Sequence, residues 1–337
     1  MDRLSAFSNR MTVALCCLFA FAGCTDNTAT DGNRLPDGKY PMTFTATVDG
    51  LTVTRAANTA DGEWTTGDKI AVQVNNIVPG NEIKEYTPSE INGNRASLTS
   101  DDPFYWQTTD ETKTVSAWYC GDGSTAADKS NAGAVPASWA VQADQAQADG
   151  YQKSDFLYAA EKNIKFDDAD KSLPFAHQTA RVVINIKKAE AATDAGVISK
   201  VIIGDNQNLA LSGTYTPTQG SGTTGTWNIS SGNKGTIIPK VTTTSSGDGD
   251  ILKTYAALVI PQKMSGKKFI AVTLTDGNTY YYTPQNTDAD LESGNQYTYE
   301  ITVKYGYLEV VTGETNGVWG DGGTDDVAST TKSSRIK

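Results

Sequence analysis

Apolar and polar residues alternate along most of this 337-residue chain after Tyr40, which is the period of a β-strand with one buried face. The segment 43–48 places Phe44, Ala46 and Val48 on one face and threonines on the other. The same pattern predicts further strands at 69–74, 114–119, 180–186, 200–203, 209–215, 254–260, 269–275, 279–283, 296–304 and 307–311. Short strands at this frequency predict an all-β protein built of β-sandwiches.

Helical patterns are scarce. Residues 137–148 have a helix-forming composition without an apolar stripe at helical spacing, so we expect a long loop with at most one helical turn. The length suits about two domains. The charged, turn-like run at 167–171 predicts a boundary between an N-terminal sandwich at 40–168 and a C-terminal sandwich at 169–319. Residues 320–337 have few side chains that can pack and are expected to be a polar tail, disordered or ordered only against a partner.

The N-terminus has the pattern of an export signal. Arg3 and Arg10 precede an apolar run at 11–21, which is too short for a bilayer-spanning helix of about 20 residues. The run ends in Phe21-Ala22-Gly23-Cys24, which looks like a bacterial lipobox. This resemblance implies acylation of Cys24, cleavage between Gly23 and Cys24, and removal of residues 1–23. The alternative is an ordinary signal peptide followed by an incidental cysteine.

The polar, turn-rich residues 24–39 predict a flexible tether between the lipid and the folded protein. Thr25 follows the cysteine where an aspartate would be expected in a protein retained at the inner membrane, so the pattern resembles lipoproteins passed to the outer membrane. After processing, Cys120 is the single cysteine left unacylated. No intrachain disulfide is then available, and the fold must depend on its hydrophobic cores.

Charge and composition exclude several kinds of function. The formal net charge of −11 disfavours nucleic-acid binding, which needs a basic face. His177 is the single histidine, no G-x-S-x-G motif is present, and a His-rich metal site is impossible. A structural role at the end of a strand is the simpler interpretation of His177. The acidic residues lie mostly in turns, where solvation explains them better than a pair of catalytic carboxylates. We therefore predict a protein that is not an enzyme and has no metal or cofactor.

The tryptophans offer an alternative function. Stacking on sugar rings would require several of them to be exposed in a row, whereas Trp and Tyr in β proteins more often cover the edge of a core. The chain has six tryptophans, at 64, 106, 118, 139, 227 and 319. A glycan-binding surface lipoprotein therefore remains the second hypothesis.

Several segments together resemble the fimbrillin family of Bacteroidales, the lipoprotein pilins and pilin-like proteins of those bacteria. The resemblance covers residues 40–319 and adds to the lipobox at 21–24. It rests on the order and spacing of segments 44–47, 54–56, 64–72, 141–145, 154–159, 173–186, 260–262 and 291–303.

The resemblance implies two tandem transthyretin-like β-sandwich domains. It also implies export to the outer membrane as a lipoprotein, and then cleavage by a trypsin-like protease after an arginine near the first strand. Arg55, followed by Ala56, is the matching position here. Subunits of such proteins polymerise by strand exchange, in which a neighbour's strand fills the open groove left by the lost one. The alternative is that Arg55 is a solvated residue at a strand end.

The donor strand is not clear from the sequence, because residues 320–337 lack alternating apolar residues. Residues 305–311 are an alternative donor, with Tyr305, Tyr307 and Val311 on one face. The sequence thus predicts a pilus subunit or an accessory or tip adhesin on the outer membrane, with other pilus subunits as partners and host or glycan ligands as further candidates. Stalk, tip and anchor positions all remain open.

Overall fold

The structure is a computed structural model that describes residues 33–48, 59–75, 77, 82–121, 138–147, 149–187, 198–218, 225–243, 251–285, 289–304, 307–315 and 330–335. Within these ranges the chain is all-β, as predicted. Its helical segments are the short 3₁₀ turns η1 (Thr59–Asp61) and η3 (Gln152–Ser154), and none of those described is long and apolar enough to span a membrane.

The first group of strands forms a closed barrel in the order β1-β4-β3-β2-β5-β7-β8. Its members are β1 (Phe44–Val48), β2 (Ile70–Val74), β3 (Ile83–Asn92), β4 (Arg95–Thr99), β5 (Thr112–Cys120), β7 (Phe156–Lys165) and β8 (Ser172–His177). Alternate residues of these strands face inward and form one hydrophobic core, as in β1, whose burial alternates along the strand. The barrel closes because β1 pairs with both β4 and β8.

The second group forms a six-stranded sheet and two smaller sheets that share a second core. The large sheet has the order β13 (Lys240–Thr243), β14 (Ile251–Val259), β9 (Ala180–Lys187), β17 (Gln296–Lys304), β18 (Tyr307–Thr315) and β19 (Thr330–Arg335). One small sheet contains β10 (Ile198–Ile203), β15 (Ile270–Leu274) and β16 (Thr279–Tyr282). The other contains β12 (Thr226–Asn228), β11 (Ser212–Thr216) and β6 (Trp139–Ala140).

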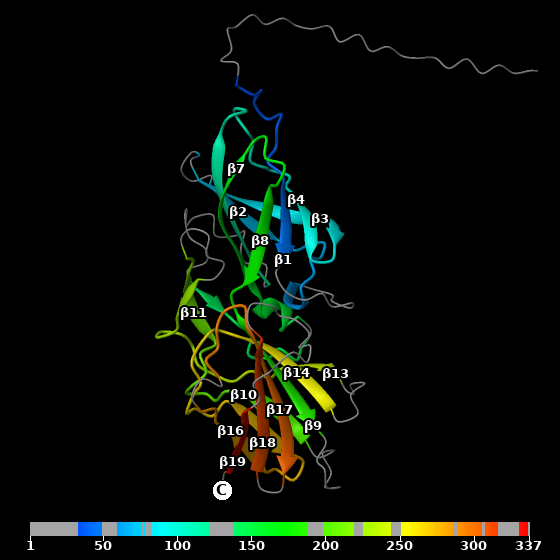
Figure 1. The fold of residues 1–337 in the computed structure, drawn as a ribbon, viewed down its shortest axis with the longest axis vertical. Helices are drawn as coiled ribbons and strands as arrows, with labels where there is room; N and C mark the ends of the chain where they lie inside the picture. Colours follow the sequence, from blue (N-terminus) through cyan, green and yellow to red (C-terminus); the bar gives the residue numbers. More distant parts are fainter. Residues whose placement is uncertain are drawn as a thin grey trace, which may run out of the picture.

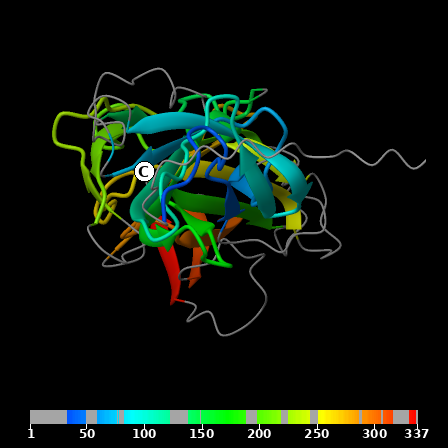
Figure 2. The ribbon, with the colours of Figure 1, turned by 90° about the horizontal axis from the view of Figure 1, so that it is seen from above.

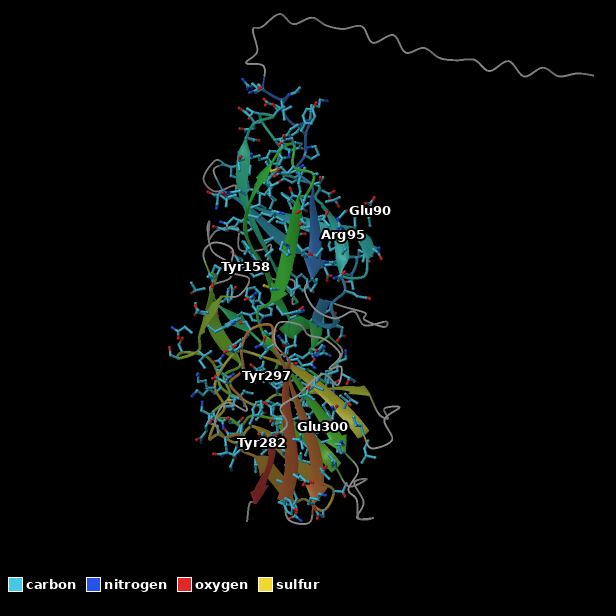
Figure 3. The ribbon with its side chains drawn as sticks, in the orientation of Figure 1. Glu90, Arg95, Tyr158, Tyr282, Tyr297 and Glu300 are labelled. Carbon is cyan, nitrogen blue, oxygen red and sulfur yellow. The ribbon has the colours of Figure 1, made fainter. Side chains whose placement is uncertain are left out.

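The two groups are stacked end to end. Figure 1 shows the barrel strands above the second group along the long axis, and the groups project over one another in the view along that axis (Figure 2). Outward-facing barrel residues, among them Trp118, Phe156 and Tyr158, belong to the second core. The Tyr158 ring, labelled in Figure 3, lies 5.9 Å from that of Tyr215 on β11. The barrel therefore has an apolar outer surface where it meets the second group.

The chain passes from the barrel to the second group at Gln178, which is fully buried. Its amide oxygen accepts hydrogen bonds from the Tyr215 hydroxyl at 2.9 Å and from Gly225 N–H at 3.1 Å, and its backbone carbonyl accepts one from Trp227 Nε1 at 2.8 Å. This crossing lies beyond the expected boundary at residue 168, because β8 is a barrel strand that pairs with β1 and β7.

Three segments differ from the sequence-based expectation. Residues 33–39, expected in a free tether, lie along the barrel, where Leu35 is buried. Residues 139–140 of the expected loop form β6, because Trp139 enters the second core. Residues 330–335 of the expected polar tail form β19, since backbone pairing with β18 needs no apolar side chains.

Gly204 and Gly277 test how tightly two turns are packed. Both have positive φ, of +76° and +88°, but a Cβ on Gly204 would lie 2.4 Å from Leu209 Cβ, whereas one on Gly277 would meet nothing within 4 Å. Gly277→Ala should cost about 1–2 kcal/mol from backbone strain alone. Gly204→Ala should cost a further ~1–3 kcal/mol from overpacking. Urea unfolding at unchanged m-value measures both changes, and equal losses would show that Leu209 does not constrain the turn.

Candidate functional site

The candidate site is the position that β1 occupies in the barrel. β1 runs antiparallel to β4, with Phe44 opposite Leu98 and Ala46 opposite Ala96. It runs parallel to β8, with Ala46 opposite Leu173 and Val48 opposite Phe175. Glu90 and Arg95, labelled in Figure 3, mark the β3–β4 hairpin beside it. Both edges of β1 are therefore paired, and its removal would leave two unpaired strand edges.

The chain leading into β1 extends this pairing. Within residues 33–42, the N–H groups of Leu35 and Met42 donate to the carbonyls of Gln107 at 2.8 Å and Phe104 at 2.7 Å. Trp106 N–H donates in turn to the Tyr40 carbonyl at 2.9 Å. These contacts continue the antiparallel track of β4, so residues 33–48 lie along one continuous partner segment.

The inward side chains of this strand are buried in the barrel core. Met42, Phe44, Ala46 and Val48 are at most 3% exposed, while the alternating threonines face outward. Burying a Met, Phe or Val side chain contributes roughly 1.5–3 kcal/mol. The strand is thus held by core packing as well as by backbone hydrogen bonds.

Tyr86 on β3 fixes the start of the strand. Its hydroxyl donates to the Met42 carbonyl at 3.2 Å and accepts from Phe104 N–H at 3.0 Å, and its ring meets the Phe44 ring edge-on at 5.5 Å. Burial raises the pKa of Tyr86, so the hydroxyl stays protonated and remains a donor. One side chain therefore connects the strand to the segment that it pairs with.

The end of the strand meets an aromatic cluster. Val48 exchanges backbone and side-chain hydrogen bonds with Asn94, at 2.9 Å and 3.2 Å. Its partner on β8, Phe175, lies edge-on to Trp64 at 5.2 Å. Trp64 also meets Tyr119 at 5.7 Å, so these rings close the barrel below β1.

Asp68 holds the turn that follows Trp64. Its carboxylate accepts hydrogen bonds from Thr65 N–H at 2.8 Å and from the Tyr119 hydroxyl at 3.1 Å. Desolvation raises the pKa of Asp68, and the neighbouring charge of Asp155 adds to this, while the two hydrogen bonds oppose it. Ionisation of this carboxyl group in the folded protein therefore costs more free energy than in the unfolded chain.

The processing residues expected from the sequence, Gly23, Cys24, Arg55 and Ala56, lie outside the described residues. β1 ends at Val48, and the next described element, η1, begins at Thr59.

η1 is anchored on the second group. Ala60 is fully buried in a cluster with Tyr151, Ala256 and Leu258, and Asp61 lies 3.8 Å from both Arg181 and Lys240. The chain is thus held on both sides of the interval that contains Arg55.

His177 pairs with a carboxylate in the protein interior. Its Nδ1 lies 2.9 Å from Asp155 Oδ1, and the two side chains are 2% and 0% exposed. Cys120 is fully buried, and the described residues contain no group of three or more His, Cys, Asp or Glu side chains that could hold a metal. The geometry fits a structural pair between the start of β7 and the end of β8.

The tryptophans that the structure describes do not form an exposed row. Those at 64, 106, 118 and 139 are at most 4% exposed. Trp227 is half-buried, with its ring 5.2 Å from that of Tyr215. Trp319 lies outside the described residues. The observation that would favour a glycan platform is therefore missing from the described part of the chain.

Tyr307 and Val311, named above as one face of an alternative donor strand, lie on the same face of β18, but this is not the face that is buried in this chain. In β18 it is Leu308, Val310 and Thr312 that are buried, whereas Tyr307 and Val311 are half-buried on the other face. β18 pairs with β17 and β19, so in this chain it is an integral strand of the second core. The alternation of side chains along a strand allows either face of β18 to be buried, and the register with β17 decides which face it is.

The fold is all-β, with an N-terminal strand that is paired on both edges. The fimbrillin-like family matches residues 54–317, and this chain belongs to that family. The expected resemblance is thereby confirmed. No protein of curated function matches the sequence significantly.

Solved structures share the fold. A candidate cell adhesion protein from Bacteroides uniformis superposes with a TM-score of 0.59 at 18% identity, covering 84% of this chain and all of the other. A candidate cell adhesion protein from Bacteroides ovatus gives a TM-score of 0.54 at 18% identity, covering 81% of this chain and 95% of the other. At this level of identity the similarity is one of fold.

Tyr86→Phe tests the anchor at the start of β1. The variant removes a hydrogen bond to Met42 and leaves the buried Phe104 N–H without its partner, so the unfolding free energy should fall by about 1–3 kcal/mol. Tyr105→Phe is the matched control, because Tyr105 is 39% exposed and its change should stay within about 0.5 kcal/mol. Urea unfolding of both variants provides the comparison, and equal effects would contradict the anchoring role.

Asp68 should give the protein a specific pH dependence. Because folding raises its pKa, its stabilising contribution is complete below 3.8 and is lost as the pH rises through the folded pKa. The unfolding free energy of the unmodified chain minus that of the Asp68→Asn variant should therefore decrease as the pH rises.

Asp110 provides the control of opposite sign. A hydrogen bond from the Thr108 hydroxyl lowers its pKa, so its contribution is present above 3.8 and is lost as the pH falls through the folded pKa. The unfolding free energy of the unmodified chain minus that of the Asp110→Asn variant should increase as the pH rises. Urea unfolding from about pH 3 to pH 7 measures both differences, and slopes of the same sign would contradict the assignment.

Proposed function

We propose that this chain is a non-enzymatic subunit or accessory adhesin of a cell-surface fimbrium that assembles by strand exchange at the β1 position. Family membership supports a pilus subunit or adhesin on the cell surface. The observation that carries the proposal is the placement of β1. It is the first strand of the barrel, it precedes Arg55, and it is paired on both edges.

In this proposal the chain is exported as a lipoprotein. The signal peptide 1–23 is removed, and Cys24 carries the acyl chains that attach the protein to the outer membrane, since two or more chains are needed for stable anchoring. The closed barrel and the second strand group serve as the two domains, and they meet at the Gln178 crossing. The short run 24–32 joins the lipid to residues packed along the barrel.

Cleavage after Arg55 then separates β1 from the rest of the chain. Once the strand leaves, β4 and β8 expose unpaired N–H and C=O groups, and the core positions of Phe44, Ala46 and Val48 become empty. A strand from another subunit restores both the hydrogen bonds and the apolar contacts. The downstream side stays in place, because Ala60 and Asp61 are anchored on the second group.

No reactive side chain takes part in this function. Backbone pairing and apolar burial provide the free energy of assembly, so other pilus subunits are the partners and no cofactor is required. Stalk, tip and anchor positions are all compatible with an acceptor slot at β1.

Arg55→Ala should block maturation in cells. The unmodified chain should give surface material that begins at Ala56 and runs as high-mass polymers, whereas Arg55→Ala should keep its acylated N-terminus and remain monomeric. N-terminal sequencing, mass spectrometry and size analysis of outer-membrane fractions measure the outcome.

Arg34→Ala is the control, since Arg34 lies before β1 on the segment paired with Thr108 and should not affect processing. An intact, acylated N-terminus on polymerised material from the unmodified chain would show that assembly does not need the release of β1.

A further inference from the structure

We infer that the groove left by the release of β1, here called the slot, binds a strand from a different protein. The inward side chains of that strand are, in order, large, large, small and medium-sized. The slot does not bind residues 316–337 of a second copy of this chain. The inference rests on the proposed release of β1 and deepens it by naming the kind of partner. It follows from the four inward positions of β1 and from what the chain's own C-terminal residues could place there.

The first two positions require large side chains. Met42 and Phe44 fill them, and both are buried beneath Tyr86, whose ring lies 5.5 Å from that of Phe44. The Tyr86 hydroxyl is positioned to donate to the backbone carbonyl of whatever residue replaces Met42. A small residue in place of Phe44 would leave a void beside Tyr86 and Leu98 in an otherwise closed core.

The third position requires a small side chain. Ala46 lies opposite Ala96 on β4 and Leu173 on β8, and all three are fully buried. The inserted strand has a neighbour on each edge at this position. A leucine or phenylalanine here would have to displace the barrel core.

The fourth position takes a medium-sized side chain and closes the slot. Val48 is 1% exposed and lies opposite Phe175, while Asn94 bonds to its backbone on the other edge. Because inward side chains alternate with outward ones, a slip by one residue would turn Thr43, Thr45 and Thr47 into the core. The slot thus recognises both an order of sizes and a register.

The C-terminal residues of this chain do not match that order. Residues 316–337 contain no two apolar residues two positions apart. Lys332 and Arg335 are three positions apart in the sequence, so an extended strand of these residues inserted at β1 would place a charge in the barrel core whichever face turned inward.

β18 cannot serve in place of β19. Its buried residues Leu308 and Val310 are in the second core, and the strand pairs with β17 along its whole length. Withdrawing it would open the six-stranded sheet, so the occupant that restores the barrel comes from another protein.

Peptide exchange into the full chain tests the inference. A recognition sequence for a site-specific protease replaces residues 50–56, the folded protein is cut there, and fluorescent peptides in excess compete with the retained N-terminal fragment. Anisotropy measures peptide binding, and mass spectrometry measures release of the fragment. The probes are peptide 40–48, peptide 324–337, and variants of peptide 40–48.

Peptide 40–48 should bind and displace the fragment. Its Ala46→Leu and Phe44→Ala variants should bind at least about tenfold more weakly. Thr45→Ser, on the outward face, should bind within about twofold of the parent peptide. Peptide 324–337 should show no binding at concentrations that saturate peptide 40–48.

Two results would overturn the inference while leaving strand exchange intact. One is binding of peptide 324–337 as tight as that of peptide 40–48, and the other is equal binding of the Ala46→Leu variant. If the cut fragment stays bound and no peptide exchanges with it, the proposed function itself is wrong, and the inference falls with it.

Discussion

The double pairing of β1 is the interaction on which the rest of the barrel depends. The other six strands of the barrel form a sheet with two edges, and β1 closes them by bonding antiparallel to β4 and parallel to β8. The same strand places Phe44, Ala46 and Val48 in the core, so hydrogen bonding and apolar burial act at one position. A sheet without β1 would have exposed backbone edges and an open core, which is a strong driving force for association with another strand.

The second group of strands keeps the remainder of the molecule in place if β1 is exchanged. Trp118, Phe156 and Tyr158 project from the barrel into the second core, and Gln178 ties the crossing between the groups with bonds from Tyr215, Gly225 and Trp227. None of these residues is among the backbone pairs of β1 with β4 and β8. Loss of one strand is therefore compatible with an intact junction.

Alternation predicted β1, β9 and β17 well, because each has one face in a core and the other in a more polar environment along most of its length. β7 was missed for a physical reason. Its first four residues, Phe156 to Ala159, are all buried, since one face fills the barrel and the other fills the second core, so no alternation remains. β8 was expected only indirectly, through the placement of His177 at the end of a strand, and the structure tolerates Pro174 in this strand opposite Thr47 on β1.

Sequence alone determined the all-β class, the inward face of the first strand, and the family, because side-chain alternation and short motifs are local properties. It left open which strands meet at β1, how the barrel closes, and which face of 307–315 is buried. Those features depend on register between segments that are far apart in the sequence, such as Ala46 with Ala96 and Leu173. Local preference is nearly the same for each alternative register, and only the packing of the complete core distinguishes them.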